Sequence, residues 1–277
     1  SGRGAMDVTQ VLHVLALAFY ALAAALLGVS LARSARRLPA AATACLAGGV
    51  VAHGAALASF AAEYRELPLV GLGPSLSVLA ILVATGSLLL ATLGRTGPLG
   101  LVLVPVAAAL AGVAEVAGMR PAAHEMAFRG PWFVLHVVLA MLGYAGLTVA
   151  FAAGLMYLLQ FRELKGKRFG AVFRFFPPLD TLDRIGRRAL MVGLPSLTVA
   201  LLLGWAWAER FGFQTGNPKI VWGVITWIVF VAALIARAGE GTARARRGAL
   251  VSVVGFAVVV AAYVLLRAAE SAGAGFL

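Results

Sequence analysis

Apolar residues along this chain occur in eight long, largely uncharged stretches that short polar segments separate. The stretches cover about 8–32, 38–62, 68–93, 98–118, 131–160, 186–208, 219–237 and 248–267. A helix that crosses a bilayer core needs about 20 apolar residues, and a helix satisfies its own backbone amides where there is no water. The pattern therefore predicts an all-α integral membrane bundle of about eight transmembrane helices.

Composition supports a lipid-embedded chain. Hydrophobic residues make up 62% of the 277 residues and charged residues 12%, against roughly 45–50% and 25% in soluble domains. We expect a single integral membrane domain over 6–277, with residues 1–5 a cloning remnant before Met6. The first stretch is too long for a cleaved signal peptide and ends in basic residues, which is typical of an anchoring stop.

Basic residues are unequally divided between the two sets of alternating loops. The loops after the first, third, fifth and seventh stretches hold 16 Lys and Arg, and the other loops and the two termini hold 7. Because positive charge accumulates on the cytoplasmic side, we predict both termini outside, in a multi-pass protein of the bacterial cytoplasmic (inner) membrane. The net charge of +12 then reflects topology and anionic lipid headgroups rather than nucleic-acid binding.

Motifs for self-contained catalysis are absent from the sequence. The chain has no Walker loop, no GxGxxG, no GxSxG and no HExxH. Cys45 is the only cysteine, which excludes a disulfide or a CxxC redox pair within this chain. We therefore expect a protein that is not an enzyme.

Three of the four histidines fall within the apolar stretches, all toward the predicted outer face, and His124 lies in an outer loop. From the helix rise, His13 and His136 lie roughly 8 Å deep and His53 roughly 13 Å deep. A neutral imidazole that only hydrogen-bonds a neighbouring helix would explain any one of them. Three intramembrane ionisable residues in one leaflet favour a ligand site.

Aromatic and basic residues flank the same predicted face. Trp132, Trp222 and Trp227 lie near the outer ends of their stretches, as interfacial tryptophan belts also do, and Arg129 precedes the fifth stretch. A flat, dianionic macrocycle whose iron takes imidazole ligands would use all of these parts, which indicates haem. Zinc is the alternative, with Glu115 joining the three intramembrane histidines as a ligand.

The longest polar segment, 161–186, interleaves basic and aromatic residues, as a segment that lies along lipid headgroups does. Two other classes of function stay open at this point. One is a transporter-like bundle for a small solute, with the histidines as a proton relay. The other is a membrane scaffold that recruits a partner through the basic inner loop 161–186.

Three segments in the second half resemble cytochrome c assembly proteins of the CcsA/HemX type. Residues 135–145 (LHVVLAMLGYA) are similar to the histidine-bearing helix of that family, 178–208 to the following helix, and 217–227 (NPKIVWGVITW) to the end of its tryptophan-rich haem-handling segment. The likeness is strongest over 131–267, and near His13 and His53 the chain resembles the HemX and YpjD branches. The tryptophan-rich segment is degenerate, since GFQTGN at 212–217 replaces its run ending in Trp-Asp and no histidine follows His136.

The resemblance implies a helical bundle that binds or handles haem on its outer side, with His136 as one axial ligand. We predict a non-covalent, b-type haem, with His13 as the depth-matched second ligand and His53 as the alternative. The implied role is haem trafficking, or haem and cytochrome c biogenesis and its regulation. The expected partners are the lipid bilayer, haem, and a haem-biosynthesis or cytochrome-biogenesis protein.

Overall fold

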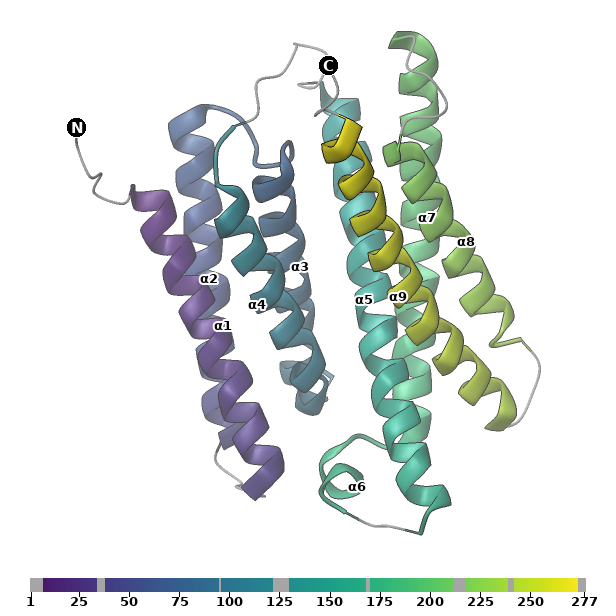
Figure 1. Cartoon of the computed structure of the whole chain (residues 1–277). Coiled ribbons are helices and arrows are strands. Elements are labelled where there is room, and N and C mark those ends of the chain that lie inside the picture. The colour runs from purple at the N-terminus through teal and green to yellow at the C-terminus, as the bar shows by residue number, and fades with distance from the viewer. Residues whose placement is uncertain are drawn as a thin grey trace. The chain divides into compact units, whose positions relative to one another are not determined.

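The computed structural model describes residues 7–33, 38–94, 96–121, 130–167, 170–211, 218–238 and 242–273. All the regular secondary structure in these ranges is helical (Figure 1), which confirms the all-α prediction. Within the described residues, seven helices are long and apolar enough to cross a membrane, and an eighth apolar segment, Ile220–Ile235, is shorter. The predicted side of the termini stays a prediction, and residues 1–5 lie outside the described ranges.

The chain forms two compact units, each of which we describe by itself. The N-terminal unit comprises 1–127 and 163–177, and the C-terminal unit comprises 128–162 and 178–277. The first contains α1 (Val8–Arg33), α2 (Leu38–Tyr64), α3 (Leu72–Thr92), the 3-10 helix η1 (Gly97–Leu99), α4 (Gly100–Ala117) and α6 (Ala171–Phe175). The second contains α5 (Pro131–Lys165), α7 (Leu179–Phe211), α8 (Pro218–Ile235) and α9 (Thr242–Gly273).

In the N-terminal unit, small residues let the long helices pack closely. The buried positions of α1 recur every three or four residues, so they form one face of the helix: Thr9, His13, Ala16, Tyr20, Ala23, Leu27 and Ser30. A Cβ added to Gly49 of α2 would lie 2.7 Å from Cε1 of Tyr20. Close van der Waals contact of this kind drives helix association in lipid, where apolar side chains gain nothing by leaving the solvent.

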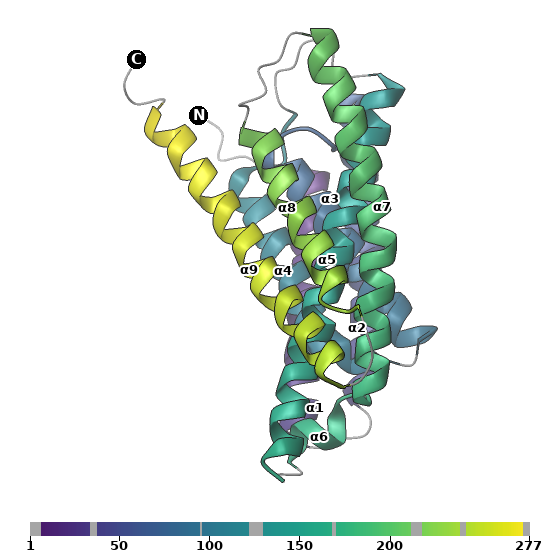
Figure 2. The same ribbon diagram turned by 90° about the vertical axis from the view of Figure 1, so that its right-hand side faces the viewer.

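In the C-terminal unit, glycines of α5 mark its contacts with two other helices. A Cβ added to Gly146 would lie 2.9 Å from the carbonyl oxygen of Ala189 in α7, and one added to Gly154 would lie 2.9 Å from that of Ala249 in α9. Helix α8 lies between α7 and α9 (Figure 2). The core between these helices consists of Leu147, Ala150, Leu190, Leu197, Phe230, Ala233 and Val259.

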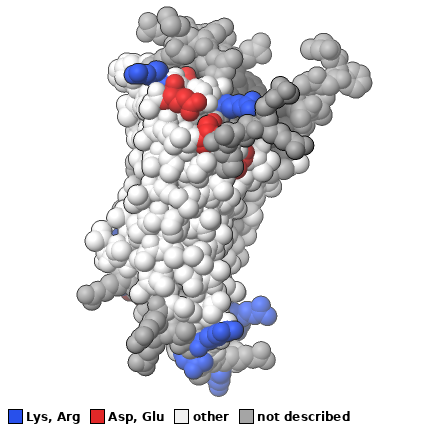
Figure 3. Space-filling model, turned by 90° about the vertical axis from the view of Figure 1, so that its left-hand side faces the viewer, with Lys and Arg blue, Asp and Glu red and all other residues white. Residues whose placement is uncertain are grey.

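Most of the described residues in the predicted inner loop, 161–186, are helical. Helix α5 continues to Lys165, α6 occupies Ala171–Phe175, and α7 begins at Leu179. A hydropathy pattern detects only the apolar part of a helix. The polar end of the same helix can continue beyond the bilayer core and keep its backbone hydrogen bonds. On the face drawn in Figure 3, a broad band carries few charged side chains, Lys and Arg gather at one end of it, and both basic and acidic residues lie at the other end.

Candidate functional site

A chain of five hydrogen-bonded side chains, which we call the polar chain, runs through the four long helices of the N-terminal unit. Nδ1 of His13 lies 2.8 Å from a carboxylate oxygen of Glu115, and Nε2 of His13 lies 3.0 Å from Oγ of Ser77. Oγ of Ser77 also lies 2.7 Å from Nε2 of His53. The hydroxyl of Tyr20 lies 3.1 Å from Nδ1 of His53. The two imidazoles are therefore joined through one serine.

One assignment of protons satisfies every member of the polar chain. The Tyr20 hydroxyl donates to His53, whose Nε2–H donates to Ser77. The Ser77 hydroxyl then donates to His13, whose Nδ1–H donates to the Glu115 carboxylate. With Glu115 ionised and both imidazoles neutral, each ring has one donor and one acceptor nitrogen, and both are used. Neither ring keeps a lone pair that is free to bind a metal.

Burial explains why the polar chain is complete. His13, His53, Ser77 and Tyr20 are each 0% exposed. A buried polar group without a partner costs about 1–3 kcal/mol. The second oxygen of Glu115 accepts from the amide of Gln10 at 3.0 Å. The network fixes the two rings edge to face, with centroids 4.9 Å apart.

These contacts bear on the candidate ligands named from the sequence. Glu115 pairs with His13. The assignment of His13 and His53 as iron ligands stays a prediction, because ligation would require either ring to give up a hydrogen bond. The zinc alternative finds no support, since no three His, Cys, Asp or Glu of the described ranges form a metal-binding group.

His136 of α5 is held differently from the other two histidines. Its Nδ1 lies 2.7 Å from the carbonyl oxygen of Ala200 in α7. A carbonyl only accepts, so Nδ1 carries the proton and Nε2 carries the lone pair. No hydrogen bond to Nε2 is seen among the described residues, and the side chain is half-buried. This is the arrangement of a metal-ligating imidazole, whose second nitrogen is fixed by a carbonyl.

A glycine makes room for the His136 ring. A Cβ added to Gly204 of α7 would lie 2.8 Å from Cε1 and 3.2 Å from Nδ1 of His136. The imidazole therefore packs directly on the α7 backbone, which aligns Nδ1 with the carbonyl one turn earlier. Sequence reasoning did not identify Gly204 as part of this site, because only the crossing of α5 and α7 brings the two together.

The predicted tryptophans fall into two groups. Trp132 is 63% exposed and precedes His136 by four residues, so the two share a face of α5. Trp222 and Trp227 instead point into the helix packing. The indole of Trp222 donates to the carbonyl of Val259 at 3.0 Å, and that of Trp227 donates to Oγ1 of Thr198 at 2.9 Å. Their proposed contact with a macrocycle stays a prediction.

Two predicted features lie outside the described residues. Arg129, the expected partner of the haem propionates, belongs to the stretch 122–129, which also contains His124. The degenerate segment GFQTGN at 212–217 lies outside them as well. Of the predicted site, the structure therefore places the three intramembrane histidines and the three tryptophans.

An ion cluster at the other end of the C-terminal unit was missed by the sequence analysis. Asp183 of α7 lies 3.5 Å from Nε of Arg237 and 3.1 Å from Nη2 of Arg244. Nη1 of Arg237 also donates to Oγ of Ser252 at 2.9 Å and to the carbonyl of Gly248 at 3.1 Å. Burial lowers the pKa of the Arg237 guanidinium from its ordinary value, and Asp183 opposes that shift. The cluster therefore connects α7, α9 and the residues that follow α8 through ion pairs and hydrogen bonds.

Fold and site together define a multi-pass helical membrane protein in which the half-buried imidazole of His136 bonds to a backbone carbonyl through one ring nitrogen. A sequence profile described as "Cytochrome C assembly protein" matches residues 11–271. The chain therefore belongs to the cytochrome C assembly protein family, which confirms the resemblance seen in the sequence.

Individual relatives are described as cytochrome c biogenesis proteins. The cytochrome c biogenesis protein CcsA of Gloeothece citriformis is 30% identical over 251 residues, which cover 73% of this chain and 76% of the relative. The CcsA protein of Microcystis aeruginosa is 28% identical with the same coverage. That of Parasynechococcus marenigrum is 33% identical over 161 residues, or 50% of this chain and 52% of the relative. The similarity thus extends beyond the second half of the chain.

Proposed function

We propose that this protein binds haem through His136 and acts in cytochrome c biogenesis as a membrane-embedded haem-handling protein. Family membership and the naming of its relatives as cytochrome c biogenesis proteins support the process. The single structural observation that supports haem binding is the imidazole of His136. Its Nδ1–H donates to Ala200 at 2.7 Å, which leaves the Nε2 lone pair to bind a metal.

The residues around His136 suit a flat apolar ligand. Trp132, exposed on the same face of α5, provides an aromatic surface beside the ligating nitrogen. Bound haem would supply an iron that accepts this lone pair and a macrocycle that packs on the indole. Arg129 is proposed to pair with a propionate, because a guanidinium binds a carboxylate with two hydrogen bonds.

The second axial ligand is proposed to be His13, with His53 as the alternative. Either ring must first release one of its hydrogen bonds in the polar chain. Ligation by His136 alone needs no such release. We therefore expect loss of His136 to weaken haem binding more than loss of either partner.

The wider role follows from the same proposal. We propose that the chain lies in the cytoplasmic membrane of a bacterium and holds haem by one accessible imidazole. Such a protein is suited to carry haem to a cytochrome-biogenesis or haem-biosynthesis partner, or to regulate the supply of haem to that partner. The haem is non-covalent and b-type, and the chain acts without catalysing a reaction of its own. Whichever partner receives the haem, the ligating residue is the same.

An absorption titration of the detergent-purified protein with haem tests the proposal. We expect a Soret band for the unaltered protein, its loss in His136→Ala, and only weakening in His13→Ala and His53→Ala. Gly204→Ala displaces the ring without removing it, and we expect haem affinity to fall about 10-fold to 100-fold, as for other supporting residues of metal ligands. Gly112→Ala is the matched control, because an added Cβ there has no atom within 4 Å. An unaltered protein without a Soret band, or a His136→Ala variant that binds normally, would contradict it.

A further inference from the structure

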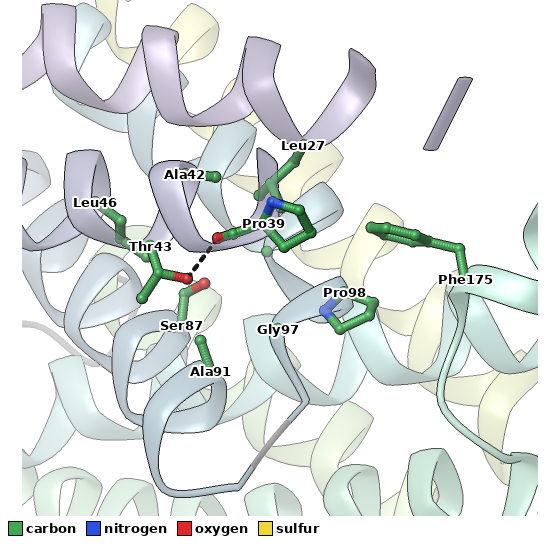
Figure 4. Close-up of a pocket in the computed structure, with 11 residues that line it drawn as sticks. Leu27, Pro39, Ala42, Thr43, Leu46, Ser87, Ala91, Gly97, Pro98 and Phe175 are labelled. Atoms are coloured by element: carbon green, nitrogen blue, oxygen red, sulfur yellow. Dashed lines mark hydrogen bonds between the residues drawn. The ribbon is translucent and has the colours of Figure 1, made fainter. Parts of the chain in front are cut away.

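A pocket of about 190 Å³ lies within the N-terminal unit, away from the polar chain (Figure 4). It is bounded by the last turns of α1 and α3, the first turn of α2, the start of α4 and the short helix α6. Three of its walls are rings, those of Pro39, Pro98 and Phe175. All three are half-buried, and they border a common space in Figure 4. Charge counting assigns this end of the helices to the cytoplasmic side.

Small residues create the space. Ala42, Ala91 and Gly97 line the pocket together with Gly100. A Cβ added to Gly100 would lie 2.9 Å from Cδ1 of Leu27. The walls are therefore set by the helix crossing itself, and a larger side chain at one of these positions would occupy the volume.

One polar side-chain atom of the pocket wall has no hydrogen-bond partner in the described part of the chain. Ser87 of α3 is 2% exposed, and its Oγ makes no hydrogen bond to any described residue. The other hydroxyl in the wall, that of Thr43, donates to the carbonyl of Pro39 at 2.9 Å. Buried hydroxyls are almost always hydrogen-bonded, so the Ser87 hydroxyl marks a place for a hydrogen-bond acceptor from outside the chain.

The volume and the lining define the ligand. An apolar cavity of about 150 Å³ holds one benzene ring, so this pocket accommodates one substituted six-membered ring and not a porphyrin. Water is a poor occupant, because it needs two to four polar partners. An acyl chain would fill the space but leave Ser87 unsatisfied. A ring that carries a carbonyl oxygen meets both requirements.

We propose that this pocket binds the head ring of a membrane quinone. One quinone carbonyl accepts a hydrogen bond from the Ser87 hydroxyl, and the ring lies between the proline rings and Phe175. The isoprenoid tail leaves through the opening among Pro39, Pro98 and Phe175 into the bilayer. The proposal concerns binding alone and is independent of haem, because no residue of the pocket belongs to the polar chain or to the surroundings of His136.

Equilibrium dialysis with tetramethyl-1,4-benzoquinone tests the proposal. All ring carbons of this probe are substituted, so it does not add to the thiol of Cys45. Tetramethylbenzene, which has the same ring and methyl groups but no carbonyl, is the matched ligand. Against a detergent-micelle blank, we expect one quinone per chain and about five- to tenfold tighter binding than for the hydrocarbon, the usual value of one hydrogen bond.

Two variants separate the hydrogen bond from the volume. Ser87→Ala is expected to abolish the preference for the quinone, and Ser196→Ala, at a half-buried serine of α7 whose hydroxyl donates to the carbonyl of Val192, to retain it. Ala91→Phe is expected to remove binding of both probes, and Ala44→Phe, on an exposed position of α2, to leave it unchanged. Equal affinity for the two probes, an unaltered preference in Ser87→Ala, or no quinone bound above the blank would overturn the proposal. If Ala91→Phe does not fold, the Ser87 comparison still decides.

Discussion

At the scale of single residues, three histidines of the same predicted leaflet have different environments. Both nitrogens of His13 and of His53 are used within the protein. Only His136 combines a donated Nδ1–H with a half-buried ring on an exposed helix face. A histidine in an apolar stretch is therefore expected to have a polar partner. Whether that partner is a ligand or another side chain depends on whether a ring nitrogen keeps a lone pair that no other side chain uses.

Ser77 is the residue on which the polar chain depends, because it contacts both imidazoles. In Ser77→Ala one nitrogen of each ring loses its partner. We expect the free energy of unfolding in detergent to fall by about 1–2 kcal/mol, near the upper end for hydrogen bonds between membrane helices. Thermal unfolding followed by circular dichroism measures the change. Ser196→Ala serves as the control, and equal stabilities of the two variants would show that the polar chain contributes nothing.

At the scale of the elements, the ends of helices were harder to predict than their existence. The eight apolar stretches correspond to α1–α5 and α7–α9, yet α5 and α7 extend well into the predicted inner loop. The ion cluster of Asp183, Arg237 and Arg244 lies at such polar ends. Arg237 was counted only as a topogenic charge, because nothing in the sequence shows that Asp183 reaches it from another helix.

The buried and the exposed ion pairs of α7 are expected to differ in strength. Arg237→Met leaves part of the Asp183 charge without its partner in a buried site, and we expect a loss of about 3–5 kcal/mol. Arg184→Ala removes a pair with Asp180 whose side chains are 55% and 76% exposed, and we expect about 0–1 kcal/mol. Thermal unfolding of both variants in the same detergent makes the comparison. Similar losses would show that burial of the cluster does not matter.

At the scale of the whole molecule, the chain divides into two units whose boundary falls at 127/128, with 163–177 assigned to the first unit. The segment that contains α6 therefore belongs with the N-terminal unit although it follows α5 in sequence. Phe175 of this segment completes the wall of the pocket. The basic inner segment, which is predicted to lie along lipid headgroups, is thus part of a packed unit.

The predicted orientation of the whole chain is open to a direct measurement. In a Cys45→Ser background, we expect Leu67→Cys to react with a membrane-impermeant maleimide on intact spheroplasts. Lys165→Cys should react only after lysis. Both positions are exposed: Leu67 lies in the turn that follows α2, and Lys165 is the last residue of α5. Labelling of Lys165→Cys in intact cells would reverse the topology inferred from the loop charges.

The amino-acid sequence alone determined that this is an all-helical membrane protein, roughly where its helices lie, and which family it resembles. Those features depend on hydropathy and on motifs, and both are properties of residues that are close together in the sequence. Only the tertiary structure decided what each polar residue does. Ser77 joins two histidines and Gly204 makes room for a third, because each contact is made across a helix crossing between residues distant in sequence. The Ser87 hydroxyl, in contrast, has no hydrogen-bond partner among the described residues. In lipid such a crossing is set by small residues and by shape, and a hydropathy pattern records neither.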